Sequence, residues 1–185
     1  NIWSSTCAAC VAELSEWSAH RDDLSGAGLD VLTLSTDHLH GGAPPEATRT
    51  ALARASSPFP NLSISEAALK GLDFLQRSVL DRRTPLPVPS TFLVNTDGEL
   101  VAFYRGPVAV NQLLQDLRLT KTDQPPGARR NAAIPFPGRW IGKAVPGRPT
   151  RVASIMADHD EVELGAAYLQ HCASLLEPKA DDHGS

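Results

Sequence analysis

The chain has 185 residues, of which 42% are hydrophobic and 21% are charged, and its formal net charge is −4. This length accommodates one α/β domain of about 120 residues and a smaller appendage. The charge excludes the basic surface that nucleic-acid binding needs, and no apolar run approaches the roughly 20 residues of a membrane-spanning helix.

The first half of the chain alternates strands and helices. Residues 1–3 are predicted to end a buried strand, and apolar residues at helical spacing predict a helix over 7–25. A short β-branched run predicts a strand at 30–36. Helices are then predicted at 45–55 and 66–80. Since the first residue is not Met and the first strand is already under way, we expect the sequence to be a fragment of a longer chain, with any signal peptide or membrane anchor upstream of it.

The second half begins with a proline-rich segment that leads into a predicted hairpin. Its strands are expected at 90–95 and 99–104, around a turn at 96–98. A helix predicted at 110–119 closes the unit. Strands alternating with helices and followed by a hairpin indicate an α/β fold, in which helices flank a mixed sheet.

The last third of the chain differs in composition. Proline and glycine interrupt every candidate helix in 122–150, which is therefore expected to be a linker or extended arm. A helical hairpin is predicted over 151–178, and the charged tail 179–185 is expected to fray. The main domain is thus expected to span 1–121.

The most informative motif is Cys7-Ala8-Ala9-Cys10, between the first strand and the first helix. Two cysteines three residues apart in the first turn of a helix can close a disulfide ring. The same helix end supplies free N–H groups and a positive dipole end that favour a thiolate. A strand, a CxxC pair and a helix in this order are typical of thioredoxin-like redox proteins.

Over residues 1–119 the chain resembles the thioredoxin superfamily, and within it the TlpA/ResA-like branch of extracytoplasmic thiol-disulfide oxidoreductases. The matching segments are Asn1-Ile2-Trp3, the cysteine pair, Ala12-Glu13-Leu14, and Pro89-Ser90-Thr91-Phe92-Leu93-Val94 followed by Asp97-Gly98. The resemblance implies a thioredoxin-like fold and thiol-disulfide exchange with protein substrates and a further redox partner. It also implies a location outside the cytosol. No bound cofactor is expected, because the cysteine pair itself carries the two electrons.

The resemblance also implies roles for individual residues. Cys7 would be the attacking thiolate, and Cys10 would resolve the mixed disulfide. Pro89 would follow a cis peptide bond and face the pair, so that the Val88 backbone can bind a substrate strand.

Three residues near the pair complete the predicted site. Trp3 and Thr6, which precede Cys7, are expected to contribute to the substrate surface. Glu13 stands where this branch carries a glutamate beside the site, and we expect it to tune thiol ionisation or relay a proton to Cys10. A solvated glutamate on the helix surface is the alternative. Thioredoxin itself has a buried Asp where this chain has Asn1.

Two other chemistries fit the same residues less well. Asp37-His38-Leu39-His40 could complete a metal site with the cysteines, but the spacing of copper-binding Sco proteins is absent and no metal is expected. Peroxiredoxins need a PxxxTxxC pattern, and Ser4 stands at its threonine position, which makes a peroxidase a minor alternative.

The C-terminal hairpin resembles part of a tetratricopeptide repeat, on the basis of Ala166, Ala173 and Pro178. A single repeat cannot bury its own face, so the resemblance implies further repeats and a protein partner bound through these helices. The alternative is one hairpin packed on the redox domain. Cys172, within the hairpin, is expected to be a small core residue. The rival function for the whole chain is a redox-inactive binding module that combines a thioredoxin fold with repeats.

Overall fold

The computed structural model describes residues 1–39, 42–80, 84–96, 100–121, 139–141, 149–158 and 160–174. In this part of the chain six strands form one mixed sheet in the order β3-β2-β1-β4-β5-β6. The strands are β1 (Ile2–Trp3), β2 (Thr33–Ser35), β3 (Asn61–Ser63), β4 (Ser90–Val94), β5 (Leu100–Arg105) and β6 (Arg139–Ile141). The helices are α1 (Ala8–Ala19), α2 (Arg21–Gly26), α3 (Pro45–Arg54), α4 (Glu66–Leu80), α5 (Val110–Lys121), α7 (Pro149–Ala157) and α8 (Val162–Ser174).

Strand β1 lies at the centre of the sheet and leads directly to the cysteine pair. It pairs in parallel with β2, where Ile2 faces Leu34, and antiparallel with β4, where Ile2 faces Ser90. Both residues of β1 are buried, because helices cover both faces of the sheet at this point. The β4–β5 hairpin follows on the other side. A central β–α–β unit with an antiparallel hairpin and a closing helix is the thioredoxin-like arrangement.

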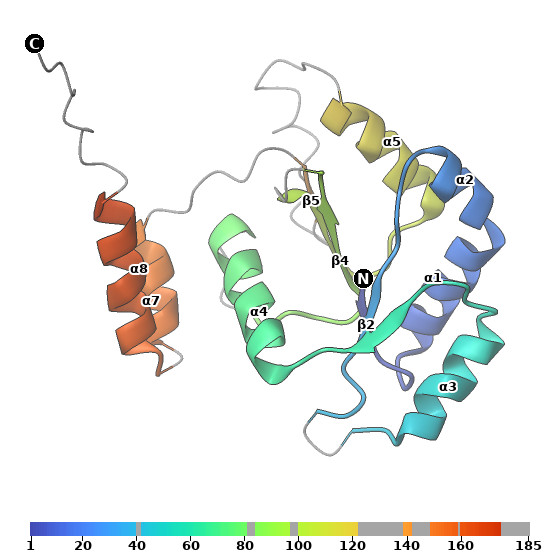
Figure 1. The fold of residues 1–185 in the computed structure, drawn as a ribbon, viewed down its shortest axis with the longest axis horizontal. Helices are drawn as coiled ribbons and strands as arrows, with labels where there is room; N and C mark the ends of the chain where they lie inside the picture. Colours follow the sequence, from blue (N-terminus) through green and yellow to red (C-terminus); the bar gives the residue numbers. More distant parts are fainter. Residues whose placement is uncertain are drawn as a thin grey trace, which may run out of the picture.

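The helices form two layers around the sheet. Figure 1 shows α1, α2, α3 and α5 on one side and α4 on the other, with the α7–α8 pair outside α4. Trp17 of α1 lies in the main core beside Leu24, Leu113 and Tyr104. Burial of this apolar surface is the main source of stability for such a layer. No helix among the described residues has the length and apolarity to cross a bilayer.

Two predicted elements differ from the structure. The helix expected over 7–25 is divided at His20, whose backbone leaves the helical region at φ −111° and ψ 22° and whose ring bonds Asp23 at the start of α2. Strand β3 is absent from the prediction because its three residues carry no strand pattern. Asn61 is half-buried, and Leu62 and Ser63 are exposed. The strand is built by parallel pairing with β2, in which Leu34 faces Leu62.

Part of the segment expected to be a linker or arm also joins the sheet. Strand β6 pairs antiparallel with β5, with Trp140 opposite Phe103. Beyond it, α7 and α8 pack on each other, and α7 packs against α4. Lys70 of α4 forms an ion pair with Glu161. The predicted turn at Asp97 and Gly98, most of 122–150 and the tail 179–185 lie outside the described residues.

Candidate active site

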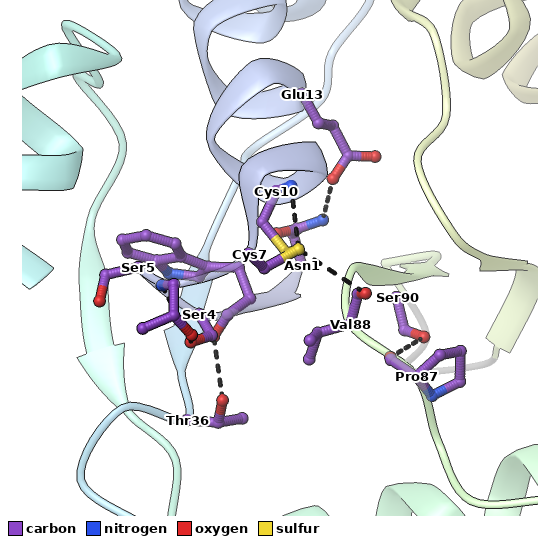
Figure 2. The surroundings of a disulfide bond; sticks show 12 residues. Asn1, Ser4, Ser5, Cys7, Cys10, Glu13, Thr36, Pro87, Val88 and Ser90 are labelled. Carbon is purple, nitrogen blue, oxygen red and sulfur yellow. Dashed lines mark hydrogen bonds between the residues drawn. A yellow bond between two sulfur atoms is a disulfide. The ribbon is translucent and has the colours of Figure 1, made fainter. Parts of the chain in front are cut away.

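The cysteine pair lies where β1 ends and α1 begins (Figure 2). Cys7 and Cys10 form a disulfide with their Cα atoms 5.3 Å apart. Cys7 is the N-cap of α1, and its Sγ accepts a hydrogen bond of 3.2 Å from the Cys10 N–H. Cys7 is half-buried, whereas Cys10 is fully buried. An incoming group can therefore reach the first sulfur but not the second.

The loop before β4 faces this disulfide. The Val88–Pro89 peptide bond is cis, the isomer that the resemblance implies, and the Val88 carbonyl oxygen lies 3.8 Å from Cys7 Sγ. Val88 is 37% exposed. On the inner side, the Pro89 carbonyl accepts a bond of 2.9 Å from the Gly106 N–H. Gly106 has φ +90°, a conformation that residues with a Cβ rarely adopt.

Glu13 is buried on α1, three residues after Cys10, so the alternative of a solvated surface glutamate is wrong. Only 3% of its surface is exposed. Its Oε1 accepts a bond of 2.7 Å from the Val108 N–H, and its Oε2 accepts one of 2.9 Å from Asn1 Nδ2. Burial raises the pKa of this carboxyl from 4.5 to about 7, although these two hydrogen bonds act against the rise.

Replacing Glu13 by Gln is expected to change how stability depends on pH. A raised pKa in the folded state means that the folded protein binds the proton more tightly, so this group destabilises the fold progressively as pH rises from 4.5 through about 7. Gln has the same shape and does not titrate. Between pH 5 and 8 the wild type should lose about 2–3 kcal/mol relative to the variant.

Urea unfolding of both proteins at pH 5, 6, 7 and 8 measures this difference. Titrating groups that do not interact with Glu13 cancel in the comparison, whereas the Asn1 amine, whose pKa the Glu13 charge raises, contributes to it. A difference in unfolding free energy that does not vary with pH would show that Glu13 keeps an ordinary pKa.

The two other predicted contact residues differ in position. Thr6 is exposed beside Cys7, where a substrate can reach it. Trp3 is fully buried, so the expectation that it contributes to the substrate surface is wrong. Trp3 belongs to a buried cluster that includes Cys10 and Leu14, and its Nε1 donates to Asn61 Oδ1 at 2.9 Å.

Asp37, considered above as part of a metal site, instead supports the loop that carries Cys7. Its Oδ1 accepts bonds from Ser4 Oγ at 2.7 Å and from the Ser5 N–H at 2.9 Å, and its Oδ2 accepts from Thr48 Oγ1. Burial opposes ionisation, but these hydrogen bonds outweigh it and lower the pKa of Asp37. The neighbouring His38 is exposed, and His40 lies outside the described residues.

The sequence matches no family model and no curated protein. Among solved structures, the chain is similar to the crystal structure of StoA from Bacillus subtilis, with a TM-score of 0.45 and 18% identity over 62% of this chain and 76% of StoA. The assignment of a thioredoxin-like fold rests on the order of the strands and on the position of the cysteine pair. The fold and site define a thioredoxin-like domain with a CxxC disulfide at the start of α1.

Proposed function

We propose that this protein is a thiol-disulfide oxidoreductase that acts on protein thiols and disulfides through Cys7 and Cys10. The observation that carries the proposal is the unequal exposure of the two sulfurs. One is accessible at a helix N-terminus, and the other is sealed behind it. A structural disulfide would gain nothing from an accessible sulfur beside an open backbone carbonyl, whereas exchange requires the accessible sulfur and a polypeptide substrate can bind the carbonyl.

Reduction of a substrate proceeds in two displacements. The Cys7 thiolate attacks a substrate disulfide, a Cys7–substrate bond forms, and one substrate sulfur leaves as a thiolate that takes up a proton. Cys10 then gives up its proton and attacks Cys7 Sγ, which closes the Cys7–Cys10 disulfide and releases the second substrate thiolate. Two electrons pass to the substrate. Oxidation of a dithiol substrate is the reverse sequence, starting from the disulfide.

The α1 N-terminus favours the Cys7 thiolate. The first turn of α1 contains no acidic residue, so its positive dipole end is not neutralised there. In the mixed disulfide, the Val88 backbone would bind the substrate strand beside the attacked sulfur.

Glu13 would take the proton of Cys10. The two residues lie three positions apart on α1, a spacing that places their Cβ atoms about 5–6 Å apart. A carboxyl whose pKa is about 7 can accept and return a proton at neutral pH. The Glu13→Gln variant should accordingly lose the pH dependence with which Cys10 resolves mixed disulfides.

Partners and location follow from the same proposal. The substrates would be protein thiols or disulfides, with a second redox protein that regenerates the pair. We place this chemistry outside the cytosol, where disulfides persist. The TlpA/ResA-like branch remains the family proposed for the chain, and the tetratricopeptide likeness of α7 and α8 remains a prediction.

A binding module is the second candidate, and one observation favours it. Val162 is 63% exposed and Leu164 is 49% exposed at the start of α8, so the hairpin leaves apolar surface uncovered. In that case a partner would bind the α7–α8 hairpin and the cysteine pair would not turn over. Insulin reduction with a dithiol donor separates the two, because a module without redox activity gives no turnover.

Trapping tests the oxidoreductase directly. In a Cys10→Ser variant that also carries Cys172→Ser, Cys7 can still attack, but nothing displaces the substrate. We expect a stable mixed disulfide with protein substrates that carry a disulfide, visible as a gel shift that dithiothreitol reverses. Absence of any adduct, together with a Cys7 that resists alkylation by iodoacetamide, would contradict the proposal.

A further inference from the structure

Helix α4 carries polar side chains on the face where a helix against a sheet normally buries apolar ones. Gln76 is fully buried, and Arg77 is 8% exposed. They surround Asp73: Arg77 Nη2 lies 2.7 Å from Asp73 Oδ2, and Gln76 Nε2 lies 3.2 Å from Asp73 Oδ1. Burying such polar groups costs free energy unless they are paired. Their partners therefore indicate what this cluster does.

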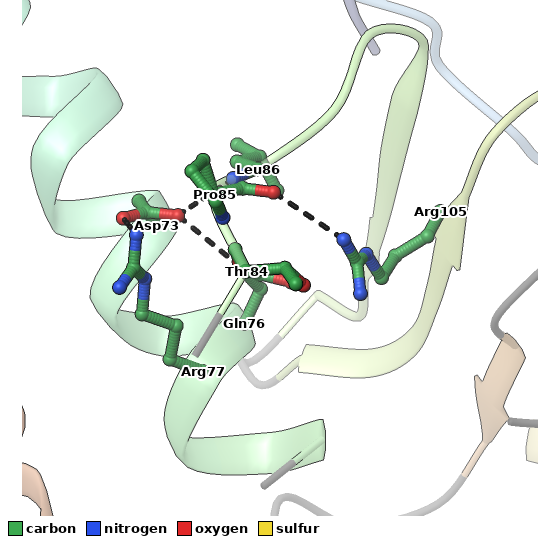
Figure 3. A network of polar contacts seen from close by, with 7 residues as sticks. All are labelled: Asp73, Gln76, Arg77, Thr84, Pro85, Leu86 and Arg105. Atoms are coloured by element: carbon green, nitrogen blue, oxygen red, sulfur yellow. Dashed lines mark hydrogen bonds and ion pairs between the residues drawn. The ribbon is translucent and has the colours of Figure 1, made fainter. Parts of the chain in front are cut away.

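The role is visible in what this cluster binds outside its own helix. Figure 3 shows Asp73 and Gln76 facing the segment that precedes the cis-proline. Asp73 Oδ1 accepts a bond of 2.7 Å from the Leu86 N–H, and Gln76 Nε2 donates one of 2.7 Å to the Thr84 carbonyl. From β5, Arg105 donates to the Pro85 carbonyl at 3.3 Å.

The sequence of this segment makes the Leu86 contact important. Residues 85–89 read Pro-Leu-Pro-Val-Pro, so only Leu86 and Val88 have a backbone N–H. Such a segment cannot be held by a backbone ladder of its own. The Leu86 N–H is therefore one of only two backbone donors in this segment through which the rest of the molecule can orient it. Asp73 accepts the hydrogen bond from this N–H.

The other end of the segment is fixed as well. Ser90 Oγ donates to the Pro87 carbonyl at 2.7 Å. Between these anchors Val88 presents its carbonyl to Cys7 Sγ, and in the described part of the chain no residue accepts a bond from its N–H. Val88 is thus the residue left open to a substrate strand, and it lies only two residues from the Asp73 contact.

We propose that Asp73 is a positioning residue for substrate binding: by holding the Leu86 N–H it sets the orientation of the Val88 backbone beside Cys7. The inference rests on the proposed exchange reaction. It concerns substrates that need a backbone partner, namely polypeptide disulfides. A small disulfide without peptide groups reacts at Cys7 without using Val88.

The test compares two substrates in the 185-residue chain. Reduced wild type and Asp73→Ala are mixed with insulin and, separately, with hydroxyethyl disulfide, and the second-order rates are measured. Asp73→Ala should lower the insulin rate about tenfold and leave the hydroxyethyl disulfide rate unchanged, because misplacement of a binding group affects only the substrate that uses it. Asp73→Asn keeps an oxygen acceptor for Leu86 and should restore the insulin rate.

Asp116→Ala provides the matched control. Asp116 is also a buried aspartate, bonded to Tyr104 Oη at 3.0 Å, but it lies on α5 away from the cysteine pair. Its removal should leave the ratio of the two rates at the wild-type value. Equal loss toward both substrates in Asp73→Ala, or loss toward neither, would overturn the positioning role while the exchange reaction stands. A wild type that reduces neither substrate would overturn both.

Discussion

Serine at position 7 is expected to abolish exchange, lowering the rate of insulin reduction by at least about a thousandfold. The reason is chemical, since a serine hydroxyl is neither ionised at neutral pH nor able to form a disulfide. The fold should survive, because the side chains are similar in size and Cys7 is only half-buried at a helix N-cap, a position that serine favours.

Cys172→Ser is the control for this experiment. Cys172 is the unpaired cysteine of the chain and is half-buried in α8, outside the proposed site. It should keep the wild-type turnover of insulin with a dithiol donor. If Cys7→Ser retains turnover while Cys172→Ser loses it, the reactive sulfur is the one in the C-terminal hairpin and our assignment is wrong.

Alanine at position 17 is expected to cost about 3–5 kcal/mol of unfolding free energy. Trp17 is 1% exposed and belongs to the main core, which also contains residues of α2, β4, β5 and α5. Its Nε1 also donates a bond of 3.0 Å to the Val108 carbonyl. Removing the ring leaves a cavity and a buried carbonyl without its donor.

Unfolding in urea, followed by far-UV circular dichroism, measures this loss. Trp17→Phe fills most of the volume but has no N–H, and it should cost about 1–2 kcal/mol. Val162→Ala, at a side chain that is 63% exposed, should stay within about 0.5 kcal/mol. A loss below about 1 kcal/mol in Trp17→Ala would show that the core does not depend on this ring.

Because Val108 connects the core to the site, the same substitution bears on function. The Val108 N–H donates to Glu13 while the Val108 carbonyl accepts from Trp17, so one residue links the buried carboxyl to the packed ring. If the Trp17→Ala variant folds, we therefore expect the hydrogen bond between the Val108 N–H and the Glu13 carboxylate to be weaker than in the wild type.

Local features of this protein could be predicted from its sequence. The helix Glu66–Leu80 and the strand that starts at Ser90 lie where apolar spacing and proline predicted them. The cysteine pair also lies in the first turn of a helix, as its position after a short apolar run indicated. These features depend on neighbours within a few residues, and such neighbours are present in the sequence itself.

Contacts between distant segments, in contrast, are determined only by the tertiary structure. Glu13 is buried because a loop 95 residues away covers it, and nothing around Glu13 in the sequence predicts that loop. In the same way Asp37 bonds Ser4, and Asp73 bonds Leu86, which lies 13 residues further along the chain. The local sequence around an acidic residue does not indicate whether its carboxylate faces water or a backbone N–H. Its burial, its pKa and its partner arise only when the surfaces that enclose it pack together.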